Sequence, residues 1–145
     1  MSLDQVLKIV QIVAYIAGGT SAVVAVCVSR RNARRERAQW LENLYARFYE
    51  NKAHTGLREI LDKKEPGSPE ISNLVSEEKS EWTNYLNFFE FVAYLQKSDQ
   101  LTKDDVDALF RYPLRCLKNH PEVLAYICDQ ANDYQRLKEK LAEDE

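Results

Sequence analysis

The sequence predicts an all-α protein with an N-terminal transmembrane helix and a cytoplasmic helical bundle. The first observation is composition: four Gly and four Pro among 145 residues are too few for the many turns of a β-sandwich. The second is a stretch over residues 9–29 that contains no charged side chain. The third is the spacing of apolar residues in the remainder, which recur every three or four positions, as on one face of a helix.

The transmembrane helix is predicted from Ile9 to Ser29. At 1.5 Å per residue, this stretch spans about 30 Å, the thickness of the hydrocarbon core of a bilayer. A core helix of a soluble protein would present a polar face to water, but the polar residues Gln11, Thr20 and Ser21 are too few and too scattered to form one. A cleaved signal peptide would carry its basic residues before the apolar run, whereas here they follow it.

Positive charge predicts the orientation of this helix. The span is followed by a basic juxtamembrane segment, residues 30–38, whose five arginines are Arg30, Arg31, Arg34, Arg35 and Arg37. The N-terminal flank, residues 1–8, holds one Lys and one Asp. Because positively charged flanks stay in the cytoplasm, residues 1–8 are expected outside and the rest of the protein inside. The arginines are also expected to bind anionic lipid headgroups.

Small and polar residues lie within the predicted span. Three small residues repeat at a spacing of four, and three polar residues are placed before and among them. In chain order they are Gln11, Ala14, Gly18, Thr20, Ser21 and Ala22. Rows of small residues let membrane helices approach closely, so we expect a homo-oligomer in which these residues line or pack the centre.

Residues 39–145 are predicted to form a four-helix bundle. A stripe of apolar residues from Trp40 to Phe48, continuing loosely to Leu61, indicates a first helix that runs unbroken from the membrane into the bundle. The sequence KKEPGSP at residues 63–69 concentrates helix breakers and predicts a loop. A second helix is expected over residues 76–96. Its surplus of aromatic residues is expected to face a neighbouring subunit.

Two further helices complete the predicted bundle. Thr102 and Asp105 match a capping box and open the third helix. Pro113 is expected to kink or shorten it, because proline lacks the N–H that a helix interior uses. Residues 119–121, Asn-His-Pro, break the helical pattern, and the last helix is expected to run from Pro121 to about Leu141.

Composition excludes several kinds of chemistry. The three cysteines, at positions 27, 116 and 128, form no C-x-x-C pair, so neither a disulfide scaffold nor a thiolate zinc site is predicted. No glycine-rich phosphate loop or H-E-x-x-H motif is present, and we expect no cofactor and no metal. Residues 39–145 carry 14 basic and 21 acidic side chains. Such an acidic bundle favours RNA binding only where a local basic pocket exists.

One pair of residues suggests chemistry at the break before the last helix. Arg115 and His120 form an R-x4-H motif. A histidine can transfer protons near neutral pH, and a forked guanidinium matches phosphate oxygens, so the two side chains are expected to converge at one mouth of the bundle. In the structural alternative, Arg115 ties down a helix end and His120 caps the Pro121 helix. Arg47 and His54 form a second match, R-x6-H.

This layout resembles that of the HEPN superfamily and, within it, the small membrane-anchored accessory proteins of type VI-B CRISPR loci. The segments YLNFFEFVAYL and ALFRYPLRCLKNHPEVLAYI are also similar to a widespread bacterial membrane-protein domain. The resemblance implies a HEPN-like bundle at the bacterial inner membrane, an interface or RNA-sensing role for Arg115 and His120, and a homo-oligomeric ring. It also implies a pore that depolarises the membrane and enhances an RNA-guided RNA-targeting effector. HEPN nucleases carry Asn, Asp or His where this chain has Cys116, which argues against cleavage.

Three hypotheses follow from the sequence. The first is a homo-oligomeric membrane pore in CRISPR-linked antiviral defence, with itself, membrane lipids and RNA or the RNA-guided effector as partners. The second is a membrane-tethered, metal-independent HEPN ribonuclease that uses Arg115 and His120. The third is a membrane-anchored regulatory binding module.

Overall fold

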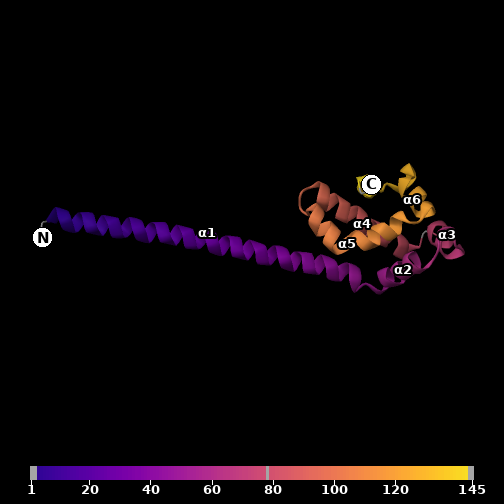
Figure 1. Ribbon diagram of the computed structural model, residues 1–145, viewed down its shortest axis with the longest axis horizontal. Helices are drawn as coiled ribbons and strands as arrows, with labels where there is room; N and C mark the ends of the chain where they lie inside the picture. The colour runs from indigo at the N-terminus through magenta and orange to yellow at the C-terminus, as the bar shows by residue number, and fades with distance from the viewer. Residues whose placement is uncertain (1–2, 78, 144–145) are drawn as a thin grey trace. The chain divides into compact units, whose positions relative to one another are not determined.

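The described part of the chain is helical throughout, which confirms the all-α fold class. The computed structural model describes the backbone of residues 3–77 and 79–143, and the side chains of residues 25–77 and 79–143. Within these ranges there is no strand. The elements, in chain order, are α1 (Leu3–Tyr49), α2 (Lys52–Lys63), α3 (Pro69–Ser76), α4 (Ser80–Lys97), α5 (Lys103–Lys118), α6 (Pro121–Cys128), the 3-10 helix η1 (Gln130–Asn132) and α7 (Gln135–Glu143) (Figure 1).

Helix α1 is continuous over Leu3–Tyr49, as expected for a first helix that enters the bundle without a break. The chain divides into two compact units, residues 1–44 and residues 45–145, so the last turn of α1 belongs to the second unit. Among the residues described, no helix combines the length and the apolar character that crossing a membrane requires. The side chains of residues 9–24, the larger part of the predicted span, lie outside the described residues.

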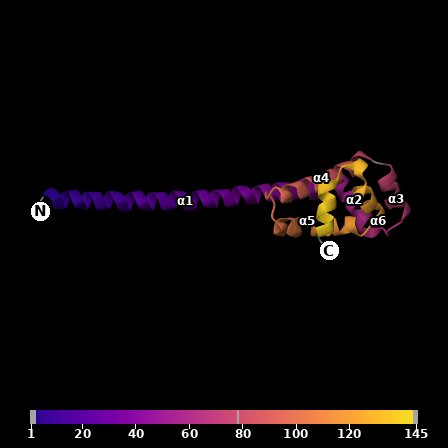
Figure 2. The same ribbon diagram turned by 90° about the horizontal axis from the view of Figure 1, so that it is seen from above.

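The second unit is a bundle of short helices. In it, α4 packs most extensively against α7, and α5 contacts α2, α4 and α6. Helices α2, α3 and α6 gather at one end of this bundle (Figure 2). The predicted apolar face of the second helix is confirmed, because all of its members are buried on α4: Trp82, Tyr85, Leu86, Phe89, Val92 and Leu95.

Phe48, in the last turn of α1, lies at the centre of the core. Its ring is fully buried and packs within 4.9–5.6 Å, between ring centroids, of six aromatic or imidazole rings. These belong to Tyr49, His54, Tyr85, Phe88, Phe89 and Phe110, and come from α1, α2, α4 and α5. Because aromatic rings bury large areas, this cluster contributes strongly to the stability of the bundle.

Several helix boundaries differ from the sequence-based expectation. The apolar stripe expected to continue to Leu61 is interrupted after Tyr49, since the Asn51 side chain accepts a hydrogen bond from the Ala53 N–H at 3.0 Å and starts α2. The helix expected from residue 76 begins at Ser80, after the separate helix α3. The bundle therefore contains more and shorter helices than the four that were predicted.

The prediction of a single last helix is also wrong. This helix is divided into α6, η1 and α7, because the Asp129 carboxylate accepts a hydrogen bond from the Ala131 N–H at 3.0 Å and starts η1. Asp133 then turns the chain with φ of 56°, in the left-handed region that aspartate tolerates better than most residues. The loop at 63–69 and the capping box of Thr102 and Asp105 are confirmed.

Pro113 lies inside α5 and does not end it. Proline cannot donate to the carbonyl four positions earlier, which here is that of Leu109. The Tyr49 hydroxyl donates a hydrogen bond to this carbonyl at 3.0 Å and replaces the missing backbone donor. Of the two expected effects, a kink or a shortening, the shortening is therefore wrong, because a side chain 60 residues away satisfies the acceptor.

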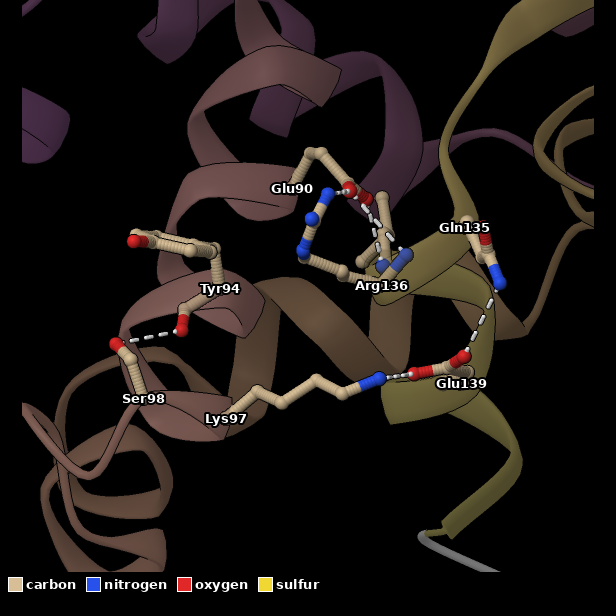
Figure 3. A network of polar contacts seen from close by, with 8 residues as sticks. Glu90, Tyr94, Lys97, Ser98, Gln135, Arg136 and Glu139 are labelled. Carbon is tan, nitrogen blue, oxygen red and sulfur yellow. Dashed lines mark hydrogen bonds and ion pairs between the residues drawn. The ribbon is translucent and has the colours of Figure 1, made fainter.

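Glu90 connects α4 to the start of α7. Its carboxylate accepts hydrogen bonds from the Leu137 N–H at 2.7 Å, from the Arg136 N–H at 3.2 Å and from the Arg136 guanidinium at 3.3 Å (Figure 3). The first N–H groups of a helix lack partners within the helix, and its N-terminus attracts negative charge. Glu90 therefore acts as the N-terminal cap of α7 from another helix. Lys97 and Glu139 form a second, exposed ion pair between the same helices at 2.7 Å.

Replacing Glu90 by Ala is expected to lower the free energy of unfolding by about 1–3 kcal/mol, because two backbone N–H groups lose their acceptor. The measurement is urea unfolding of the purified protein, followed by tryptophan fluorescence. Glu139→Ala is the matched control, since it removes a carboxylate of the same interface that makes only exposed contacts, and its effect should be much smaller. Equal effects of the two variants would contradict the capping role.

Candidate functional site

The candidate site is the junction between α5 and α6, where the R-x4-H motif lies. Arg115 is in the last turn of α5, and His120 is the second of the two residues between the helices, directly before α6. Pro121 occupies the first turn of α6, as predicted from its fixed φ.

His120 lies in the interior of the bundle. It is 2% exposed, and its Nε2 is 2.8 Å from the carbonyl oxygen of Leu61. A carbonyl only accepts, so Nε2 carries the proton and donates it. The Leu61 carbonyl belongs to the last turn of α2, where carbonyls lack partners within the helix. His120 therefore closes the C-terminal end of α2.

This contact corrects the structural alternative, in which the His120 side chain caps the Pro121 helix. His120 occupies the N-cap position of α6, but its side chain makes no capping hydrogen bond there. Its Nδ1 is buried and has no hydrogen-bond partner among the described atoms. The imidazole thus stabilises the end of a helix that precedes it by about sixty residues, rather than the start of the helix that follows it.

Arg115 lies on the surface. Its side chain is exposed, and its guanidinium carbon is 5.3 Å from the centre of the Tyr112 ring. The Tyr112 hydroxyl in turn donates a hydrogen bond to the Asp62 carboxylate, which raises the pKa of Tyr112 to about 12. Arg115 is held over an aromatic ring at the surface, where it is available to an anion.

The structure does not bring Arg115 and His120 to one mouth of the bundle. One side chain is in solvent and the other is buried against Leu61. Cys116, next to Arg115, is buried, and burial raises the pKa of its thiol, so it is not an activated nucleophile. The imidazole of His120 is therefore not available as a proton donor or acceptor at the exposed guanidinium of Arg115.

The second motif, Arg47 and His54, is also divided between surface and core. Arg47 is exposed, whereas His54 is buried, 5.3 Å from the Phe48 ring between centroids. Burial lowers the pKa of His54 below its ordinary value of 6.5. Arg58 was not predicted as a site residue. Its guanidinium carbon lies 4.6 Å from the centre of the Tyr49 ring, and its guanidinium donates a hydrogen bond to the Tyr49 carbonyl at 3.3 Å.

A cleft beside Arg115 is lined by further charged side chains that were not predicted from the sequence. Lys103, Arg111 and Lys118 of α5 line it together with Arg115. Positions 103, 107, 111 and 115 form one row at a spacing of four, which is the signal that could have identified it. Among the described residues, no group of three or more His, Cys, Asp or Glu side chains is arranged to hold a metal ion.

The remaining candidate residues are on α1. The five arginines of the juxtamembrane segment are all exposed. The side chains proposed to line or pack an oligomer lie outside the described residues; they are those of Gln11, Ala14, Gly18, Thr20, Ser21 and Ala22. No family model, curated protein or solved structure matches the chain.

The positions of the motif residues predict a large effect on stability for one substitution and a small effect for the other. His120→Ala is expected to lower the free energy of unfolding by about 1–3 kcal/mol, because the Leu61 carbonyl is left buried without a donor. Arg115→Ala, on the surface, should change it by less than about 0.5 kcal/mol. Denaturant unfolding of both variants measures the difference. A stable His120→Ala protein would show that the contact to Leu61 contributes little.

The lowered pKa of His54 predicts a pH dependence of stability. The unfolded chain takes up a proton near the ordinary pKa of 6.5, whereas the folded protein resists it until a lower pH. The His54 contribution is therefore complete above about pH 7 and is lost as the pH falls below about 6.5. We expect the slope of unfolding free energy against pH in this window to be smaller in His54→Phe, which keeps an aromatic ring. The same slope in both proteins would exclude His54 as its origin.

Proposed function

We propose that this protein is a homo-oligomeric pore-forming effector of the bacterial inner membrane, which acts in CRISPR-linked antiviral defence. In this proposal residues 9–29 span the membrane, residues 1–8 are outside, and the bundle is in the cytoplasm. Opening of the pore depolarises the membrane and enhances an RNA-guided RNA-targeting effector. The observation that carries the proposal is a single helix, α1, that contains a charge-free stretch of 21 residues followed directly by five arginines.

The chemistry of this helix supports a membrane location. A charge-free stretch of about 20 residues satisfies its own backbone hydrogen bonds as a helix and has the length of the hydrocarbon core. The arginines that follow are exposed and keep their charges in water, where headgroup phosphates can reach them. No loop separates the apolar stretch from the arginines, so both belong to one continuous helix.

Helical periodicity supports association of several copies. With 3.6 residues per turn, positions 30, 34 and 37 share one face of α1, and 31 and 35 lie beside them. The row at positions 14, 18 and 22 falls on the opposite face by the same periodicity. Copies that associate through the row of small residues would therefore turn their arginines away from one another. This reduces repulsion between like charges in the oligomer.

The cytoplasmic bundle offers a second surface for such an oligomer. Phe91 and Tyr94 on α4 are 45% and 43% exposed, and their rings stack with centroids 6.5 Å apart. Large aromatic side chains are enriched at interfaces between proteins.

The HEPN-like character of the bundle belongs to the same proposal and is supported by the position of Arg115 and His120 just before α6. We do not propose ribonuclease activity, because these two side chains lie apart.

Dye release from liposomes tests the pore. The purified full chain, reconstituted into vesicles that contain anionic lipid, is expected to release a trapped fluorophore. Replacing Ala14, Gly18 and Ala22 together by Ile should slow this release about tenfold or more, because bulky side chains keep the helices apart. In bacteria stained with a potential-sensitive dye, expression of the original protein should depolarise the membrane, and expression of the triple Ile variant should depolarise it less.

The matched control is the triple variant Val13→Ile, Val23→Ile and Val24→Ile. It also places three isoleucines within the same span, but on the face opposite the small residues, and should release dye like the original protein. Absence of release from the original protein, or equal inhibition by both triple variants, would overturn the proposal.

A further inference from the structure

The cleft between α5 and α7 has the properties of a binding site. It has a volume of about 440 Å³, and four cationic side chains of α5 line it, namely Lys103, Arg111, Arg115 and Lys118. Ligand sites in proteins are commonly between about 300 and 1,000 Å³. The cleft is thus large enough for one small molecule.

Helix stabilisation alone does not account for these cations. Lys118 and Arg115 are in the last turn of α5, where positive charge complements the helix dipole. Lys103 is the first residue of α5, where a positive charge opposes the dipole, and Arg111 is in the interior. Their common feature is that they face one cleft, in a bundle of 14 basic and 21 acidic residues.

The lining of the cleft has a net positive charge, because its four cations outnumber the two carboxylates, those of Asp107 and Glu143. Asp107 is paired with Arg111 at 3.1 Å, and the side chain of this arginine is 73% exposed. Arg115 contacts the face of the Tyr112 ring, which leaves its N–H donors available. Arginine matches phosphate oxygens with two parallel hydrogen bonds, and lysine adds a mobile point charge.

The other walls of the cleft are different in character. Leu114 and Leu141 are almost fully buried and supply an apolar floor. Glu143, near the end of α7, provides an acceptor. A ligand that fits all three features has an anionic group for the cations, a flat apolar part for the leucines, and hydroxyl or amino donors for Glu143.

We propose that this cleft binds a nucleoside di- or triphosphate. The phosphates contact Arg115, Lys118 and Arg111, the base and sugar lie over Leu114 and Leu141, and a hydroxyl or amino group donates to Glu143. A single nucleotide fits the cleft better than a long RNA strand, because the acidic surface of the rest of the bundle repels an extended phosphate backbone. The proposal does not depend on pore formation.

Binding of a fluorescent ADP analogue to the detergent-solubilised full chain tests this site. We expect saturable binding that inorganic pyrophosphate, ADP and ATP compete with and adenosine does not. Arg115→Gln and Lys118→Gln should each weaken binding about tenfold or more, since each removes charged hydrogen bonds to phosphate. Both side chains are at least partly exposed, so the variants should keep the circular dichroism spectrum of the original protein.

Lys138→Gln is the matched control. Lys138 is an exposed cation of α7 that does not line the cleft, and its loss should leave binding unchanged. Three results would overturn the proposal: no binding of any nucleotide, equal weakening by Lys138→Gln, or binding of an RNA oligonucleotide through Arg115 in the absence of ADP binding. Because dye release is measured without nucleotide, failure of this site and failure of the pore give separate results.

Discussion

The ends of short helices dominate the architecture of the bundle. Every α-helix leaves its first N–H groups and last carbonyls without partners, and helices of eight to eighteen residues have many ends for their length. Here side chains distant in sequence supply the missing partners: Glu90 for the start of α7 and His120 for the end of α2. The aromatic cluster around Phe48 then packs the helices whose ends are held in this way.

The same constraint explains why the motif residues are separated. A histidine placed between two helices can turn outward toward substrate or inward toward an unpaired carbonyl. In this protein the imidazole of His120 donates a hydrogen bond to the Leu61 carbonyl, and the imidazole is therefore buried away from solvent. Arg115 stays outside and belongs to a cationic cleft with Lys103 and Lys118. The motif therefore supplies one residue that holds a helix end and one exposed cation of the cleft.

Sequence reasoning succeeded where local patterns decide the outcome. The capping box of Thr102 depends on residues only three positions apart, and the buried face of α4 follows directly from its apolar spacing. It failed where a single polar side chain decides whether a helix continues. Asn51 ends the stripe that was expected to reach Leu61, and Asp129 divides the last helix. Pairings between remote residues, such as Tyr49 with Leu109, leave no periodic signal.

Pro113 has a consequence for cooperativity. Because its missing N–H is replaced by the Tyr49 hydroxyl, the middle of α5 depends on the last turn of α1. Opening of that turn exposes the Leu109 carbonyl and weakens α5 at the position where its own backbone cannot compensate. The two segments, 60 residues apart in sequence, are therefore coupled through this hydrogen bond. Hydrogen exchange in the middle of α5 is thus expected to respond to the opening of a turn that no loop connects to it directly.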